Sequence, residues 1–195
     1  MKRVLIAYAT NAGSTVEVAQ AVAEVLGQAA QVDLRPLTEV NSVVDYDAVV
    51  VGAPMILGWH RAAQQFIRRH RRVLAGKRVA YFCTLMSLTQ PASGEGEPVS
   101  LFIDSQLAKP AHSPGRLSLK ERYATVGNYL RPLLRSAPAV RPASVAFLGG
   151  KLELFRLKWW QMLFVMAIIR AQPGDFRNWP AIRQWAENLK PALLA

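Results

Sequence analysis

The chain has 195 residues and a formal net charge of +11, with a sequence pI of about 10.4. This length fits one domain, residues 1–195, with a full hydrophobic core, and the charge favours an anionic partner such as lipid headgroups, a polycarboxylate or nucleic acid. The single cysteine, Cys83, excludes an internal disulfide, and no Cys/His cluster has the spacing of a zinc site. We therefore expect no metal site and a reducing, cytoplasmic compartment. No signal peptide is visible, because Met1 leads directly into a strand pattern.

The first predicted elements are a strand over Lys2–Tyr8, a short polar loop over Ala9–Thr15 and a helix over Thr15–Gln28. Backbone N–H groups at a helix start point outward, and the helix dipole favours negative charge there. Hydroxyl groups in the loop can add hydrogen bonds to phosphate oxygens, and they belong to Thr10, Ser14 and Thr15. The sequence therefore predicts a phosphate-bearing ligand at the end of the first strand.

The loop differs from two common phosphate-binding motifs. It has one glycine, Gly13, and it lacks both the Gly-Lys-Ser/Thr ending of a Walker A loop and the three-glycine dinucleotide fingerprint. A hydroxyl-lined loop without lysine favours a small monophosphate over a triphosphate with magnesium. In an alternative interpretation Ser14 is only the helix N-cap and Glu17 completes a capping box. Capping alone does not require hydroxyls at three loop positions, so we favour the phosphate site.

Strand and helix patterns alternate along the rest of the chain, with a loop over Pro54–Trp59 between them. The further predicted strands are Gln31–Arg35, Ala48–Ala53, Lys77–Thr84 and Ser144–Leu148. The further predicted helices are His60–Leu74, with Phe66, Ile67, Val73 and Leu74 facing inward, Lys120–Ser136 and about Trp179–Leu189. This alternation predicts an α/β fold with an open parallel sheet and right-handed crossovers.

The alternation is interrupted from about Ser87 to Ser118, where prolines and glycines surround a brief apolar patch at Val99–Ile103. A structureless loop of this length is unusual in a compact domain. We expect residues 87–118 to be either a functional insertion after the fourth strand or a partly disordered segment.

Arginines cluster around one histidine in Arg68–Arg72, late in a predicted helix. We favour a solvated face, where positive charge suits the helix C-terminus, over a site for an anionic surface or substrate. Nucleic acid is not expected, because no known nucleic-acid motif accompanies the charge.

An apolar stretch with basic residues at both ends lies within Leu152–Arg170, and Trp159 and Trp160 stand at one end of it. It is too short to span a bilayer, which needs about 20 apolar residues. Two alternatives stay open. The segment either makes peripheral contact with the inner face of a membrane or with a hydrophobic acceptor, or it is a helix that covers the sheet.

Four stretches carry a family resemblance over nearly the whole chain apart from residues 87–118. They are Ile6–Thr10 with Gly13-Ser14-Thr15, Val51–Pro54 with Gly58-Trp59-His60, Phe147–Leu152, and Gly174–Trp179. In this order they resemble a flavodoxin-like domain, which implies a five-stranded parallel sheet in the order 2-1-3-4-5 with helices on both faces. They are also similar to one branch of that family, the menaquinone-dependent protoporphyrinogen oxidases.

The resemblance implies FMN as the cofactor. Its phosphate would lie on the first loop, and its ring between the loops after the third and fourth strands, which agrees with ligand binding at the carboxyl ends of parallel strands. The implied cofactor-binding residues are Thr10, Asn11, Ala12, Gly13, Ser14, Thr15, Pro54, Met55, Ile56, Leu57, Gly58, Trp59, Thr84, Leu85, Met86 and Ser87. Trp59 either packs on the flavin or packs at the start of its own helix, and we leave both open.

No catalytic side chain is predicted, because His60, His70 and His112 have no visible triad partners and no acid/base dyad is evident. Each histidine is expected to be structural or exposed, which suits redox chemistry that resides in a flavin.

Three functions follow from the resemblance, and at this point we favour the first, with the second as its alternative. The first is an FMN-dependent oxidoreductase of the protoporphyrinogen oxidase type, in which a tetrapyrrole precursor is oxidised and the electrons pass to a quinone. The second is a flavodoxin-type electron carrier or flavin-binding module without its own substrate. The third is a relative that has lost flavin and acts through its basic surface. The sequence does not predict an oligomeric state.

Overall fold

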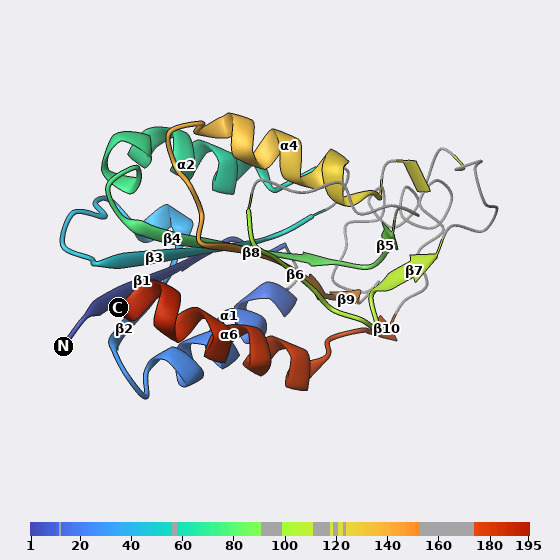
Figure 1. Cartoon of the computed structure of the whole chain (residues 1–195), viewed down its shortest axis with the longest axis horizontal. Coiled ribbons are helices and arrows are strands. Elements are labelled where there is room, and N and C mark those ends of the chain that lie inside the picture. The colour runs from blue at the N-terminus through green and yellow to red at the C-terminus, as the bar shows by residue number, and fades with distance from the viewer. Residues whose placement is uncertain are drawn as a thin grey trace.

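A computed structural model describes residues 1–11, 13–55, 58–90, 99–110, 118, 121–122, 124–152 and 174–195. Among these residues, six strands form a parallel sheet in the order β2-β1-β3-β4-β8-β6. The strands are β1 (Arg3–Tyr8), β2 (Gln31–Pro36), β3 (Ala48–Pro54), β4 (Arg78–Leu85), β6 (Leu101–Ile103) and β8 (Ser144–Gly149). The predicted order of the first five is confirmed, with β8 as the fifth. Their carboxyl ends meet at one edge of the sheet, at the right of Figure 1, and we call this the carboxyl edge.

The sixth strand corrects the expectation of a five-stranded sheet. β6 lies inside the predicted insertion and pairs with β8, and Val145 N–H donates to Ser100 O at 2.9 Å. Without β6, the outer side of β8 would expose a row of unpaired backbone N–H and C=O groups. Pairing with the three residues of β6 satisfies these groups and is therefore favourable.

The described part of the insertion is ordered in other places as well. β5 (Leu88–Gln90) and β7 (Ala108–Pro110) form a separate two-stranded parallel sheet. The expectation of partial disorder also concerned residues 91–98 and 111–117. These residues lie outside the part of the chain that the structure describes.

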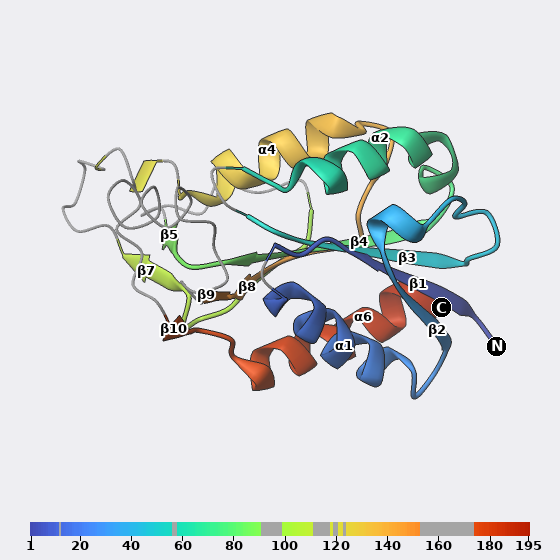
Figure 2. The same ribbon diagram turned by 180° about the vertical axis from the view of Figure 1, so that it is seen from behind.

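Helices cover both faces of the sheet (Figures 1 and 2). α1 (Ser14–Leu26) and α6 (Trp179–Leu194) lie on one face, and α2 (Arg61–Leu74) and α4 (Val126–Ser136) lie on the other. A short 3-10 helix, η1 (Leu37–Glu39), follows β2, and β9 (Lys151–Leu152) pairs antiparallel with β10 (Gly174–Asp175).

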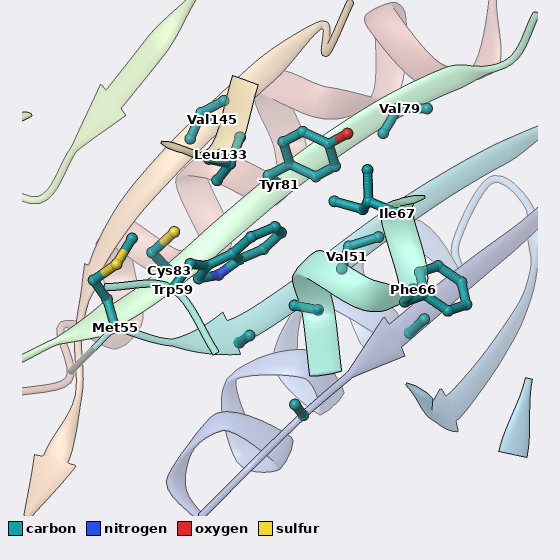
Figure 3. Close-up of a cluster of buried hydrophobic side chains, with 14 of the residues drawn as sticks. Val51, Met55, Trp59, Phe66, Ile67, Val79, Tyr81, Cys83, Leu133 and Val145 are labelled. Atoms are coloured by element: carbon teal, nitrogen blue, oxygen red, sulfur yellow. The ribbon is translucent and has the colours of Figure 1, made fainter. Parts of the chain in front are cut away.

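Two apolar cores result, one on each face of the sheet. Alternate residues of each central strand point to opposite sides, so that Val49 and Val51 pack under α2 while Ala48 and Val50 pack under α1. All seven residues of β3 are buried, as expected for a central strand of a parallel sheet. Figure 3 shows the core beneath α2, where Trp59, Tyr81 and Cys83 lie side by side.

Two helices differ from their predicted bounds. α4 begins at Val126 and not at Lys120, because the side chain of Thr125 caps it by accepting from Asn128 N–H. α6 continues to Leu194, well beyond Leu189. Its last turn is retained because Leu193 is fully buried, and this burial outweighs the helix-breaking tendency of a proline near the end.

The arginine cluster of α2 does not face solvent uniformly. Phe66, Ile67 and Leu74 are buried as predicted, and Val73 is partly buried. His70 also points inward, because it is only 8% exposed and its ring lies 4.6 Å from that of Phe66.

No helix in the described ranges combines the length and the apolar content that crossing a bilayer requires. Of the segment Leu152–Arg170, only Leu152 lies within the described residues, as the second residue of β9. The structure therefore leaves both predictions for that segment untested.

Candidate functional site

The first candidate feature is the start of α1 at the carboxyl edge. Gly13 is the N-cap residue, with φ of 88° in the left-handed region, and no side chain caps the helix. Gly13 N–H donates to Thr10 Oγ1 at 2.9 Å, which closes the loop. The alternative in which Ser14 is the N-cap is therefore wrong: Ser14 is the first helical residue, and the Glu17 carboxylate binds Arg177. Among the described residues no side chain accepts from the first-turn N–H groups, which are the groups of a helix start that favour an anion.

The hydroxyl groups of the loop do not all face the same way. Thr15 is fully buried, and its Oγ1 lies 3.0 Å from Oγ1 of Thr84 at the end of β4. Thr10 closes the loop, while Ser14 is half-buried. Thr15 thus ties α1 to the sheet, and Thr10 and Ser14 are the hydroxyls nearer to solvent. Ala12, also predicted to bind the cofactor, lies outside the described residues.

A side-chain bridge joins this loop to the start of α2. His60 is the N-cap of α2, and its Nδ1 accepts from Ala62 N–H at 3.2 Å. This contact leaves the proton on Nε2, which donates to Asn11 Oδ1 at 3.1 Å. Desolvation lowers the pKa of His60, which favours this neutral form. His60 therefore has the structural role that the sequence predicted.

The loop after β3 turns tightly back on itself, since Met55 and Trp59 pair across it. Gly58 has φ of 126°, a left-handed conformation that favours glycine, and no described atom lies within 4 Å of the position that a Cβ would take there. Of the predicted site residues here, Ile56 and Leu57 lie outside the described residues.

Trp59 points into the core under α2 (Figure 3). Only 3% of the residue is exposed, and its ring centroid lies 5.5 Å from that of Tyr81. Gln64 Nε2 also donates to Trp59 O at 2.9 Å, which fixes the start of α2. In this arrangement the indole packs at the start of its helix, the second of the two roles that the sequence left open.

The loop after β4 lies between two neighbouring loops. Met55 N–H donates to Thr84 O, and Gly150 N–H donates to Leu85 O, both at 2.9 Å. Thr84 and Leu85 are buried, and the next two residues, Met86 and Ser87, are half-buried. The predicted loops after β1, β3 and β4 therefore meet at the carboxyl edge.

A fourth segment, which was not predicted as part of the site, completes this edge. Phe176 N–H donates to Gly150 O at 3.0 Å, and a Cβ on Gly149 would lie 1.8 Å from Phe176 O. The backbone at Phe176 therefore lies flush against the end of β8, which only a glycine at position 149 permits. The motif Gly174–Trp179 stood out in the sequence, but only the fold shows that it lies at this edge.

Arg177 fixes that segment to α1. Its Nη1 lies 2.6 Å from Glu17 Oε2, and its Nε lies 2.7 Å from Asp175 Oδ1. The guanidinium carbon also lies 4.6 Å from the centre of the Trp179 ring. These carboxylates raise the pKa of Arg177, and the guanidinium lowers the pKa of Asp175.

Charge is distributed unevenly over the two helical layers. The α2–α4 layer carries a set of exposed arginines, here called the arginine face: Arg61, Arg68, Arg69, Arg71, Arg72, Arg131, Arg135 and Arg141. The sequence has no acidic residue between Asp47 and Glu95 or between Glu121 and Glu153, so neither α2 nor α4 carries an acid. The acid described beside α2 is Glu39 of η1. The α1–α6 layer is mixed, with Glu17, Glu24 and Glu187 beside Arg183 and Lys190.

A groove of about 520 Å³ borders the arginine face, but it is not part of the carboxyl edge. Its lining residues are Val99, Leu134, Arg135, Pro138, Val140, Arg141 and Pro142. Pro142 lies two residues before β8, whereas the carboxyl edge lies at the far end of that strand, which itself spans about 17 Å at 3.3 Å per residue.

Comparisons with known proteins agree with the fold. A family model described as a flavodoxin domain matches residues 5–177. A Fusobacterium nucleatum flavodoxin bound to flavin mononucleotide is 11% identical, with a TM-score of 0.53 over 99% of each chain. A short-chain flavodoxin associated with a non-canonical PDU bacterial microcompartment is 13% identical, with a TM-score of 0.53 over 98% of each chain. At these identities the two structures show a shared fold. No curated protein sequence matches the chain.

Proposed function

Because this chain belongs to the flavodoxin domain family, we propose that it is a flavoprotein whose carboxyl edge binds FMN. The observation that carries this proposal is the start of α1, where Gly13 has the left-handed conformation and no described side chain accepts from the first-turn N–H groups. A phosphate monoester supplies the acceptor oxygens and the negative charge that such a helix start favours.

The residues of the first loop fit a phosphate in a specific way. Backbone N–H groups from Ser14 onward point at the anion, and the hydroxyls of Thr10 and Ser14 contribute the side-chain contacts. Thr15 acts by holding the first turn of α1 against β4. The bridge from His60 to Asn11 holds the loop beside α2, so the phosphate site is largely formed before a ligand arrives.

The flavin ring is proposed to lie between the loop after β3, Pro54–Trp59, and the loop after β4, Thr84–Ser87. Support comes from the hydrogen bond between Met55 and Thr84 that joins the two loops, and from Gly58, which has no described atom within 4 Å of its Cβ position. When bound, FMN supplies one- or two-electron redox chemistry. The protein binds the phosphate, orients the ring and excludes water from one side of it.

We favour a flavodoxin-type electron carrier or flavin-binding module as the function class, and the match to a flavodoxin domain over residues 5–177 supports this choice. The described residues at the carboxyl edge form no evident acid/base pair. The histidine described at this edge, His60, caps α2, and Cys83 is fully buried, which raises the pKa of its thiol.

A protoporphyrinogen oxidase-type activity with a quinone acceptor is the second candidate. One observation favours it: two stretches that suggested it, Phe147–Leu152 and Gly174–Trp179, pack together at the carboxyl edge through the β9–β10 pair and the Phe176–Gly150 hydrogen bond. The comparisons give it no support. Basic side chains would hold the propionates of a tetrapyrrole precursor, and contact with a membrane or quinone through residues 152–170 belongs to this candidate alone.

The test of FMN binding is a titration of the purified protein, followed by flavin fluorescence and by the absorbance spectrum. We expect flavin fluorescence to be quenched with saturation at one equivalent, and FMN to bind more tightly than riboflavin. A colourless protein that leaves FMN fluorescence unchanged would overturn the proposal and favour a relative that has lost flavin.

The two function classes are separated by two further measurements on the FMN-loaded protein. A redox titration that finds a stable one-electron-reduced form favours the carrier. Turnover of protoporphyrinogen with a menaquinone analogue, above the rate of autoxidation, favours the oxidase.

A further inference from the structure

A carboxylate stands close to the proposed phosphate position. Glu17 lies three residues after Ser14, so its Cα is about 4.5 Å further along the axis of α1 at 1.5 Å per residue. Side chains on a helix tilt toward its N-terminus, which directs a residue in this first turn back toward the anion. An acidic residue there stabilises the empty helix through the dipole, but an unpaired carboxylate repels a phosphate that competes for the same N–H groups.

Arg177 binds this carboxylate from the other end of the chain. Its Nη1 lies 2.6 Å from Glu17 Oε2, and the Arg177 side chain is only 5% exposed. Because Asp175 binds Nε at 2.7 Å and the Trp179 ring lies 4.6 Å from the guanidinium carbon, the group is held on three sides. A guanidinium fixed in this way keeps the Glu17 carboxylate in one direction.

The position of Arg177 is itself set by the sheet. The neighbouring Phe176 is hydrogen-bonded to Gly150 and packed against Gly149 at the end of β8, and Asn178 caps α6 by accepting from Ala181 N–H. The residue is thus placed between two rigid elements, and its contact with Glu17 joins the β8 end of the carboxyl edge to the first turn of α1.

We propose that Arg177 is a positioning residue for the phosphate site: it holds the Glu17 carboxylate in one fixed position and offsets its charge. This inference rests on the proposed binding of FMN. It predicts that the two partners of one ion pair affect FMN in opposite directions. Loss of Arg177 exposes the phosphate to an unbalanced carboxylate, whereas loss of the Glu17 charge removes the repulsion.

The test compares FMN and riboflavin affinities by flavin fluorescence quenching in Arg177→Gln, Glu17→Gln and the double variant. The matched control is Arg183→Gln, which removes an exposed arginine of α6 outside this cluster. Because Arg177→Gln leaves an uncompensated carboxylate near the phosphate, we expect it to weaken FMN binding about five-fold. Glu17→Gln should leave FMN binding unchanged or tighter, and the double variant should return to within about two-fold of the unaltered chain.

Riboflavin lacks the phosphate, so its affinity should change little in all of these variants. The effect of Arg177→Gln on FMN should also shrink between 50 mM and 500 mM salt, because Glu17 is partly exposed and its field is screened.

Different outcomes separate this inference from the proposal on which it rests. If the unaltered chain does not bind FMN, both are overturned. If it binds FMN but Glu17→Gln weakens binding as much as Arg177→Gln, or if riboflavin is affected equally, the ion pair only holds two segments together and the inference is wrong. If Arg177→Gln does not fold, two other variants test the inference. Glu17→Gln keeps the guanidinium in place, and Arg177→Lys keeps the positive charge at position 177. Weaker FMN binding in Glu17→Gln then overturns the inference by itself.

Discussion

The hydroxyl groups of Thr15 and Thr84 lie 3.0 Å apart in the interior, although 69 positions separate the two residues along the chain. One belongs to the first turn of α1 and the other to the end of β4, so this hydrogen bond sets the distance between the helix start and the carboxyl edge of the sheet. Neither hydroxyl is accessible to water, and each is satisfied by the other.

Replacing one of these threonines with valine should therefore be more harmful than replacing both. In Thr15→Val or Thr84→Val the remaining hydroxyl is buried without a partner, which costs about 1–3 kcal/mol. The double variant replaces both by apolar groups of the same shape and should be nearer to the unaltered chain in stability. Urea unfolding of the three variants measures this, and additive losses would show that the two hydroxyls are not coupled.

Thr10→Ala should weaken FMN binding while the fold is retained. The alanine removes the acceptor of the Gly13 N–H bond and one hydroxyl near the proposed phosphate. A lost hydrogen bond to a charged group costs about 1.5–3 kcal/mol, which corresponds to roughly 10- to 150-fold in affinity. Thr10→Ser keeps the hydroxyl and serves as the control. Equal FMN affinity in both variants would mean that the phosphate lies elsewhere.

His60 should make stability dependent on pH. Desolvation lowers its pKa in the folded chain below the ordinary 6.5, so the unfolded chain binds a proton that the folded chain does not. Stability contributed by the neutral ring is thus present above 6.5 and is lost as the pH falls from there through the folded pKa.

The variant His60→Asn keeps a capping acceptor for α2 but has no titratable ring. Urea unfolding between pH 5 and 8 should show a smaller loss of stability at low pH in this variant than in the unaltered chain. His70, whose pKa is also lowered by desolvation, is present in both chains and cancels in the comparison. Parallel pH profiles would contradict the prediction.

Two glycines should respond in opposite ways to alanine. In Gly52→Ala the new Cβ would lie 1.9 Å from Cζ of Phe82, whose ring is fully buried against Trp185. We expect a loss of about 1–3 kcal/mol or more from overpacking. Around the Cβ position of Gly127 in α4, the described residues outside the helix backbone come no closer than Arg131 Nε at 3.9 Å. Gly127→Ala should therefore gain about 0.5–1 kcal/mol. Thermal unfolding of both variants checks the signs.

The sequence was informative where local pattern decides structure. The apolar run before Tyr8, the polar loop and the helix pattern after Ser14 are contiguous, so strand, turn and helix could be predicted together. The order of the first five strands followed from the resemblance and was confirmed. The sixth strand was missed because the three residues Leu101–Ile103 are too few to show a period.

Other features depend on contacts that no local pattern encodes. A hydroxyl before a helix predicts a cap, yet Gly13 caps α1 because the left-handed turn is closed by Thr10. The contact of Glu17 with Arg177 joins residues 160 positions apart, and nothing in either neighbourhood indicates it. The inward direction of Trp59 likewise follows from its packing on Tyr81.

Among the described residues, the arginine face concentrates positive charge on the α2–α4 side of the sheet, whereas the α1–α6 layer carries charges of both signs. The electric field of these arginines turns the α2–α4 side of the protein toward an anionic partner before short-range contacts form. Salt screens this attraction beyond a Debye length of about 8 Å at physiological ionic strength. The orientation therefore takes place only when the two partners are already close. Most of these arginines lie on α2 and α4, away from the carboxyl ends of the strands. A protein bound to an anionic partner through the arginine face would therefore keep its carboxyl edge free.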